Sequence, residues 1–89
     1  MEWRLFADVA ERAGTRRVTV DAGPDPTVRD ALEALFDAHP ELRDRVMVDG
    51  DVAEHLTVLN DGTPLGAAGL DEAVGEDAEL ALFPPVSGG

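Results

Sequence analysis

The feature that most limits the folds open to this chain is one helix-forming stretch at residues 28–38, preceded and followed by short segments with strand character. Its apolar residues recur at the spacing of a single helix face: Val28, Ala31, Leu32, Leu35 and Phe36. Thr27 and Asp30 have the spacing of a capping box, and Pro40 ends the helix near Ala38. A lone helix with such a stripe needs a sheet to cover it, so the sequence predicts an α+β domain with that stripe in its core.

Two strands are predicted before this helix. Residues 2–7 and 17–21 carry apolar side chains that alternate with polar ones, which favours strands. Between them, Asp8 is suited to cap a short helical turn over residues 9–13, and Gly14 is suited to end it. We therefore expect an antiparallel pair of strands joined by a helical connection.

The remaining strands are short and follow the helix. Asn60-Asp61-Gly62 predicts a hairpin turn, because these residue types tolerate positive φ, and Pro64 marks an edge strand. We expect strands at residues 46–48, 56–59, 63–65 and 78–83, with loops at 49–51 and 66–75. The last strand is expected to lie beside the first and parallel to it, in the middle of a mixed sheet.

The composition permits one small folded domain and excludes several kinds of chemistry. Leu, Val and Phe supply 23 of the 89 residues, which is above the level at which charged chains are usually disordered. The chain has no Cys, so it offers no disulfide, thiolate metal site or thiol nucleophile of its own. Any sulfur chemistry must therefore come from a partner.

The net charge of −12 opposes binding to nucleic acids and to anionic membranes. All seven basic residues are Arg, and they lie in residues 1–45. The sequence shows neither a signal peptide nor a membrane-spanning stretch, so we expect a cytoplasmic protein. Abundant carboxylates, small apolar residues and the absence of Lys suit a salt-rich cytosol, which suggests a halophilic source.

The C-terminal residues carry the strongest functional signal. The chain divides into a domain at residues 1–83 and a tail at 84–89, which reads Pro-Pro-Val-Ser-Gly-Gly and is expected to be extended and accessible. A terminal carboxylate becomes a good acyl donor once ATP converts it to an acyl-adenylate, and a thiol, sulfide or amine then displaces AMP. Glycine suits this reaction because no Cβ shields its carbonyl. Gly89 is therefore the predicted reacting residue.

The segment Phe83–Gly89 resembles the end of the small sulfur-carrier subunit of molybdopterin synthase. The resemblance extends over the chain through four further segments: residues 5–8 with Gly14, residues 27–32, residues 58–62 and residues 75–82. With the acidic, Lys-free composition, the chain is most similar to the ubiquitin-like small archaeal modifier proteins. This resemblance implies a β-grasp fold.

The resemblance also implies a function. An E1-like enzyme would use ATP to adenylate Gly89, with the preceding tail residues needed for activation: Pro84, Pro85, Val86, Ser87 and Gly88. The product would be an isopeptide bond to lysines of target proteins, or a thiocarboxylate that supplies sulfur to molybdopterin through the large subunit of molybdopterin synthase. Because the chain has no Lys, only the Met1 amine can accept a second copy, so single attachment is expected.

Two alternative functions remain open: a dedicated molybdopterin synthase subunit that is not conjugated to proteins, and a noncovalent acidic binding domain. No catalytic residue, bound cofactor or metal is predicted, because His39, His55 and Ser87 lack a nucleophile–base spacing. The acidic segment at residues 49–55 also lacks EF-hand spacing and is interpreted as a hydrated loop. Phe83 and Phe6 are candidates for partner binding, with burial in the core as the alternative.

Overall fold

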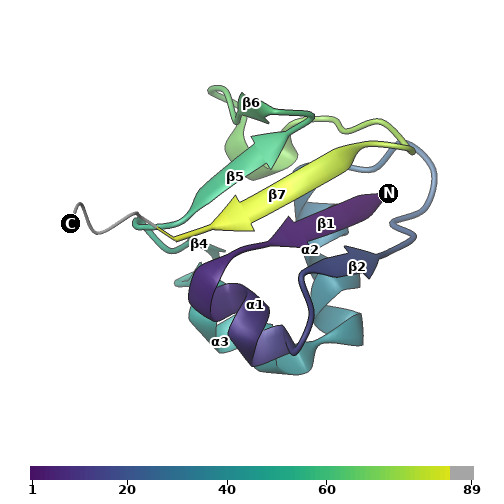
Figure 1. The fold of residues 1–89 in the computed structure, drawn as a ribbon. Coiled ribbons are helices and arrows are strands. Elements are labelled where there is room, and N and C mark those ends of the chain that lie inside the picture. The colour runs from purple at the N-terminus through teal and green to yellow at the C-terminus, as the bar shows by residue number, and fades with distance from the viewer. Residues whose placement is uncertain (85–89) are drawn as a thin grey trace.

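The computed structural model describes residues 1–84, which form a five-stranded mixed sheet with the main helix packed across one face (Figure 1). The strands lie side by side in the order β2 (Arg17–Thr19), β1 (Glu2–Leu5), β7 (Glu79–Phe83), β5 (Thr57–Asn60) and β6 (Thr63–Pro64). β1 runs antiparallel to β2 and parallel to β7, and β5 runs antiparallel to both β7 and β6. The expected central parallel pair of first and last strands is confirmed.

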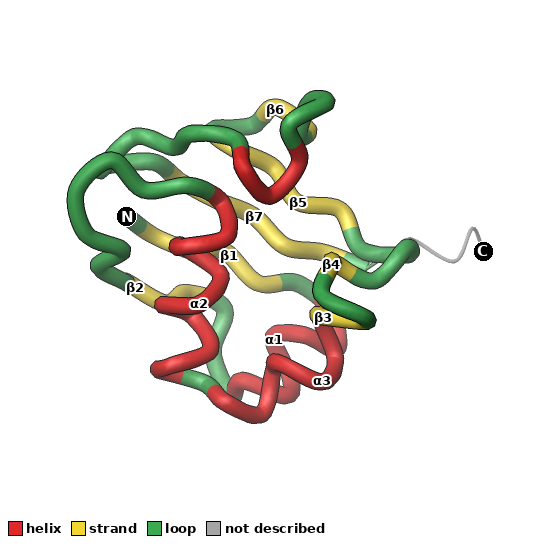
Figure 2. Tube along the Cα trace, turned by 180° about the vertical axis from the view of Figure 1, so that it is seen from behind, coloured by secondary structure: helices red, strands yellow, loops and turns green. Residues whose placement is uncertain are grey.

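The other elements connect these strands. The helices are α1 (Ala7–Ala13), α2 (Val28–Ala38) and α3 (Arg43–Val46), with short 3₁₀ helices at Pro40–Leu42 and Gly69–Asp71. A separate two-stranded hairpin contains β3 (Met47–Val48) and β4 (Asp51–Val52). Seen from behind, α2 crosses the sheet, while α1 and α3 lie together below it (Figure 2).

Helix α2 has the predicted bounds and the predicted cap. Asp30 N donates to Thr27 Oγ1 at 3.3 Å, and Thr27 N donates back to Asp30 Oδ2 at 3.0 Å, so Asp replaces the usual Glu of a capping box. The five residues of its apolar stripe are each at most 2% exposed. The prediction that this stripe forms core, and not a binding groove, is confirmed.

The inner face of the sheet meets this stripe. Trp3 and Leu5 on β1 and Leu80 and Leu82 on β7 are each at most 1% exposed. The chain thus packs a mixed sheet around one long helix with the central parallel pair β1–β7. This arrangement is the β-grasp fold, as the resemblance implied.

The start of α1 differs from the prediction. The helix begins at Ala7 after Phe6 as N-cap, and Asp8 does not cap it. Ala7 takes a positive φ of 52°, which turns the chain sharply from β1 into the helix and ends the strand at Leu5. The Asp8 carboxylate binds Arg45 instead, because the fold brings α3 beside this turn. Gly14 ends the helix with a φ of 75°, as predicted.

Two further segments are more ordered than predicted. Residues 40–46 form two helical turns, because the fixed φ of Pro40 suits the first position of a new helix as well as the end of α2. Val46 therefore belongs to α3 and not to a strand. The segment at residues 66–75, predicted as loop, contains a 3₁₀ helix and buries Leu70 and Val74.

Across residues 1–84, none of the helices combines the length and the apolar character that crossing a membrane would require.

Candidate functional site

The candidate site begins where β7 ends. Leu80 and Leu82 point into the core and are fully buried, while Phe83 lies on the opposite, outer face of the sheet. This alternation places Phe83 directly before the Pro-Pro pair. Pro84 is the last residue described, and the predicted reacting tail Pro85, Val86, Ser87, Gly88 and Gly89 lies outside the described residues.

Phe6 and Phe83 lie against each other on this outer face. Their ring centroids are 5.9 Å apart and the rings are nearly perpendicular, at 85°. Phe6 is 45% exposed, so the alternative that both rings are buried core is wrong for Phe6, and Phe83 is half-buried. An edge-to-face aromatic pair at the surface gives a rigid apolar contact at the exit of β7.

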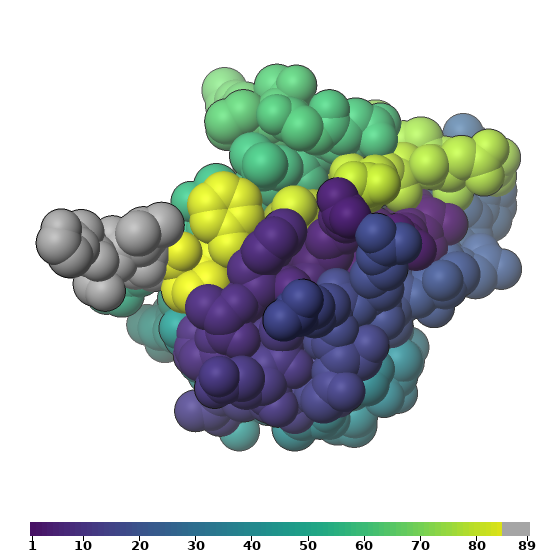
Figure 3. All heavy atoms as spheres, viewed as in Figure 1, coloured from purple at the N-terminus to yellow at the C-terminus, as the bar shows by residue number. Residues whose placement is uncertain are grey.

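The outer face continues as a row of residues in register across all five strands. Arg4 is the pairing partner of Arg17 and of Ala81, Ala81 pairs with Leu59, and Leu59 pairs with Pro64. The row therefore changes from cationic at the β2 edge to apolar at the β6 edge. Figure 3 shows this side, where atoms of β1 and β7 reach the surface with no helix over them.

Local sequence patterns do not identify this row. The sequence signal for it is the alternation of side chains along each strand. Arg4 lies between Trp3 and Leu5 and therefore points to the opposite face, and Ala81 lies between Leu80 and Leu82 and does the same. The register between strands is needed to bring these outward residues together, and no local pattern contains it.

Hydrogen bonds hold the start of β7 in place. Glu79 N donates to Asp61 Oδ1 at 2.8 Å, and Asp61 N donates to Glu79 O at 2.9 Å. Asp61 and Gly62 have φ values of 49° and 83°, so the predicted hairpin turn is confirmed, and both residues use the positive φ that this turn needs. The turn between β5 and β6 therefore positions the strand that leads to the tail.

A second carboxylate braces the same hairpin. Asn60 Nδ2 and Gly66 N donate to the two oxygens of Glu72, each at 2.9 Å. Both bonds lower the pKa of Glu72 below its ordinary value, and the bond from Asn60 has the larger effect. The carboxylate stays ionised at neutral pH and ties β5 to the segment that precedes β7.

Of the other residues considered from the sequence, His39 lies at the end of α2. His39 caps the end of α2 through its backbone N–H, which donates to Leu35 O, and its ring contacts Glu41 at 3.2 Å. In residues 1–84, no three His, Asp or Glu side chains converge on a position that would hold a metal ion, the acidic segment at 49–55 included.

Comparison with known proteins identifies the family of this chain. Residues 3–89 match the ThiS family, so the match covers nearly the whole sequence. The chain belongs to the ThiS family. The family assignment agrees with the β-grasp topology and extends through the five tail residues that the structure does not describe.

ThiS-family relatives are similar over their full length. The chain is 57% identical to small archaeal modifier protein 1 of Haloferax volcanii, with all of both chains covered. A crystal structure of the Haloferax protein superposes with a TM-score of 0.89 at 54% identity, covering 100% of this chain and 98% of the other. The solution structure of small archaeal modifier protein 1 from Methanosarcina acetivorans has a TM-score of 0.82 at 28% identity, covering 99% and 94%.

Proposed function

We propose that this chain is a ubiquitin-like protein modifier and sulfur carrier whose reacting group is the carboxylate of Gly89. The observation that carries the proposal is the full-length, 57% identity to a protein named as a small archaeal modifier. The sequence Phe83–Gly89, which follows core strand β7 directly, supports it. The folded domain then serves as a handle that an activating enzyme grips.

Both roles share one activation step. The Gly89 carboxylate attacks the α-phosphate of ATP, pyrophosphate leaves, and an acyl-adenylate forms on the E1-like enzyme. The amine of a target lysine then attacks the carbonyl, AMP leaves, the nitrogen loses a proton and an isopeptide bond results. Alternatively, hydrosulfide attacks the same carbonyl, AMP leaves, and Gly89 becomes a thiocarboxylate that a molybdopterin synthase large subunit can use.

The outer sheet face is the proposed docking surface for the activating enzyme. Phe6 and Phe83 form an exposed aromatic pair beside the point where the tail begins. An enzyme that binds this pair holds the domain while Gly88 and Gly89 enter a narrow channel that side chains would obstruct. In this scheme the chain is a substrate and not an enzyme, binds no cofactor and acts in the cytoplasm, where ATP and the target lysines are available.

The first test measures adenylation. ATP–pyrophosphate exchange by the E1-like enzyme of the same organism is expected with the full chain and is expected to vanish when Gly88 and Gly89 are deleted. Gly75→Ala serves as the matched control, because Gly75 has an ordinary φ and no atom within 4 Å of an added Cβ. No exchange with the full chain, together with partner binding that is unchanged when the two glycines are deleted, would indicate a noncovalent acidic binding domain.

The second test identifies the chemical form of Gly89 in cells by mass spectrometry. Trypsin is a poor choice, because the last basic residue is Arg45 and targets would retain residues 46–89 as a branch. A protease that cleaves after Glu leaves only residues 80–89, since Glu79 is the last Glu. An amide between Gly89 and lysine identifies the modifier role, whereas thiocarboxylate without any conjugate identifies a dedicated sulfur carrier.

A further inference from the structure

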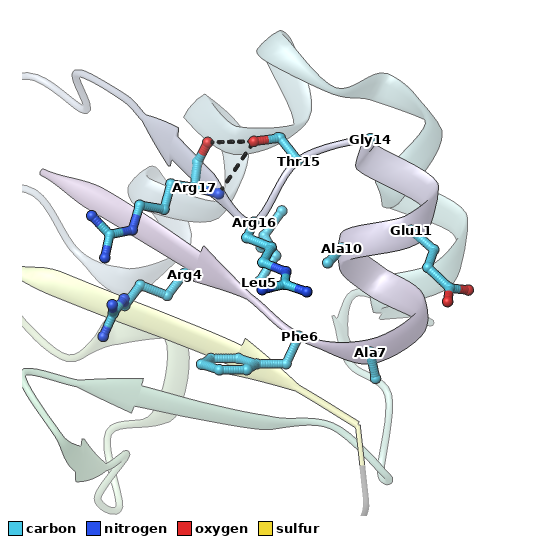
Figure 4. A pocket seen from close by; sticks show the side chains of 10 residues that line it. All are labelled: Arg4, Leu5, Phe6, Ala7, Ala10, Glu11, Gly14, Thr15, Arg16 and Arg17. Atoms are coloured by element: carbon cyan, nitrogen blue, oxygen red, sulfur yellow. Dashed lines mark hydrogen bonds between the residues drawn. The ribbon is translucent and has the colours of Figure 1, made fainter.

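A groove of about 790 Å³ lies between α1 and the first two strands, on the side of β1 away from β7. Its walls come from β1, α1 and the turn that leads into β2. Figure 4 shows Arg16 extending toward Phe6, while the side chains of Arg4 and Arg17, from paired positions on β1 and β2, extend together in the other direction, away from α1. Three of the seven arginines of an acidic chain thus line one groove.

Two of these arginines, Arg16 and Arg17, differ from Arg4 in their ion pairs. Arg29, Arg43 and Arg45 each lie within 4.0 Å of a carboxylate on residues 1–84, and so does Arg4, which contacts Glu79 at 3.3 Å. Within that part of the chain, the arginines with no carboxylate in this range are Arg12, Arg16 and Arg17. All three fall in residues 12–17, and two of them, Arg16 and Arg17, line the groove.

An aromatic surface adjoins this charge. Phe6 lines the groove and is 45% exposed, with Phe83 packed edge-on behind it. Ala7 and Ala10 form a low wall on the α1 side. Guanidinium groups bind carboxylates through two parallel hydrogen bonds, and an exposed ring accepts an apolar side chain. The groove therefore matches a ligand that carries carboxylates next to an apolar group.

The edge of the sheet is closed to an added strand at Arg17, the residue of β2 that lines the groove. β2 is an edge strand, but the Thr15 hydroxyl donates to Arg17 O at 3.1 Å and accepts from Arg17 N at 3.3 Å. These bonds occupy the outward backbone groups of Arg17, which a pairing strand would require. A ligand therefore binds the face of the groove through side chains and not by extending the sheet.

The surrounding charge restricts the ligand to a short one. Glu11 lines the far wall, and Glu2 and Glu79 occupy the next outer row of the sheet. With a net charge of −12, a nucleic acid or an anionic membrane would meet carboxylates as soon as it extended beyond the arginines. A protein segment with two or three carboxylates can neutralise the groove without reaching that rim.

We propose that this groove binds a short acidic segment of a partner protein, with carboxylates on Arg16 and Arg17 and an apolar side chain on Phe6. This interaction does not use the carboxylate of Gly89, although it shares Phe6 with the surface proposed for the activating enzyme. The groove allows an acidic chain to bind acidic partners. Salt is expected to weaken this binding, because the guanidinium groups are exposed.

The experiment titrates the ¹⁵N-labelled full chain with acetyl-Asp-Glu-Leu-Glu-Asp-amide and with its isostere acetyl-Asn-Gln-Leu-Gln-Asn-amide, up to millimolar peptide. The acidic peptide is expected to shift the amides of residues 4–7 and 14–17, and the isostere to leave them unchanged. The double variant R16Q/R17Q is expected to weaken binding about fivefold or more. Arg29→Gln, which removes an exposed arginine on α2, is the matched control and is expected to bind like the parent chain.

Several results would overturn the proposal. These are no shifts with the acidic peptide, equal shifts with the isostere, shifts that map outside the groove, or equal losses in R16Q/R17Q and Arg29→Gln. Tighter binding of a single-stranded oligonucleotide or of phosphatidylglycerol vesicles at the same residues would assign the groove to phosphate ligands instead. A thermal melt of each variant checks that it is folded. ATP–pyrophosphate exchange is measured on the same variants, so that a loss of peptide binding can be distinguished from a loss of Gly89 activation.

Discussion

Trp3 Nε1 donates a hydrogen bond to the backbone oxygen of Ala31 at 2.9 Å, which ties strand β1 to the N-terminal half of α2. The two residues are 28 positions apart, and both are fully buried. The indole thus fills the space between sheet and helix and also satisfies its own polar group there. One side chain consequently sets how the main helix sits on the sheet.

Replacing Trp3 with Phe removes this bond and leaves a space beside Ala31. We expect the free energy of unfolding to fall by about 1–3 kcal/mol, measured by urea denaturation, with an unchanged m value. Phe36→Leu, which reduces volume in the same core without removing a hydrogen bond, is the comparison. If Trp3→Phe lowers the free energy of unfolding by less than Phe36→Leu does, the hydrogen bond to Ala31 contributes little to stability.

The turn at Asp61-Gly62 requires positive φ, and Gly62 has a φ of 83°. Alanine there forces a side chain into the left-handed region, so we expect Gly62→Ala to cost about 1–2 kcal/mol in thermal or urea unfolding. Gly75→Ala is the control, because Gly75 has an ordinary φ and open space around it. Similar effects at both positions would contradict the turn geometry.

The ion pair between Asp8 and Arg45 predicts a pH dependence of stability. Arg45 Nε donates to Asp8 Oδ2 at 2.6 Å, and this bond lowers the pKa of Asp8 below its ordinary value. The unfolded chain therefore takes up the proton first, so stability present at neutral pH is lost as the pH falls below about 4. The contribution is below about 1 kcal/mol, because the Asp8 side chain is 43% exposed.

Asp8→Asn removes this contribution. Urea unfolding between pH 7 and pH 3 should show a smaller decrease in stability for Asp8→Asn than for the parent chain. Glu54→Gln changes an exposed carboxylate that, within residues 1–84, has no arginine within 4.0 Å, and it should follow the parent curve. Identical curves for the parent chain and Asp8→Asn would show that the pair makes no difference to folding.

The Phe6–Phe83 pair predicts a specific defect in activation. Phe6→Ser should change stability by less than about 1.5 kcal/mol, because the ring is half exposed, yet raise the KM of the activating enzyme about tenfold. Val48→Ser, at a position 53% exposed on the β3–β4 hairpin, is the matched control and should leave KM unchanged. Equal KM values for the parent chain and Phe6→Ser would remove this face from the docking surface.

Local signals were sufficient for the main elements. The bounds of α2, its Thr27 cap and the Asp61-Gly62 turn depend on residues within a few positions of one another, and each was predicted correctly. Asp8 shows the limit of such signals. Its position before a short helix favours a cap, but Arg45, 37 residues away, binds the carboxylate more strongly than a helix end does.

The sequence by itself determined the inward and outward faces of the strands, the apolar stripe of the single long helix and the Gly-Gly tail. The reason is that strand alternation and helical spacing depend only on residues close together in the chain. Only the tertiary structure decided that Phe6 is exposed against Phe83 and that Arg4, Arg16 and Arg17 share one groove. These contacts depend on the register between strands and on where α1 turns away from β1. Both are set by the packing of the whole core and not by any local pattern.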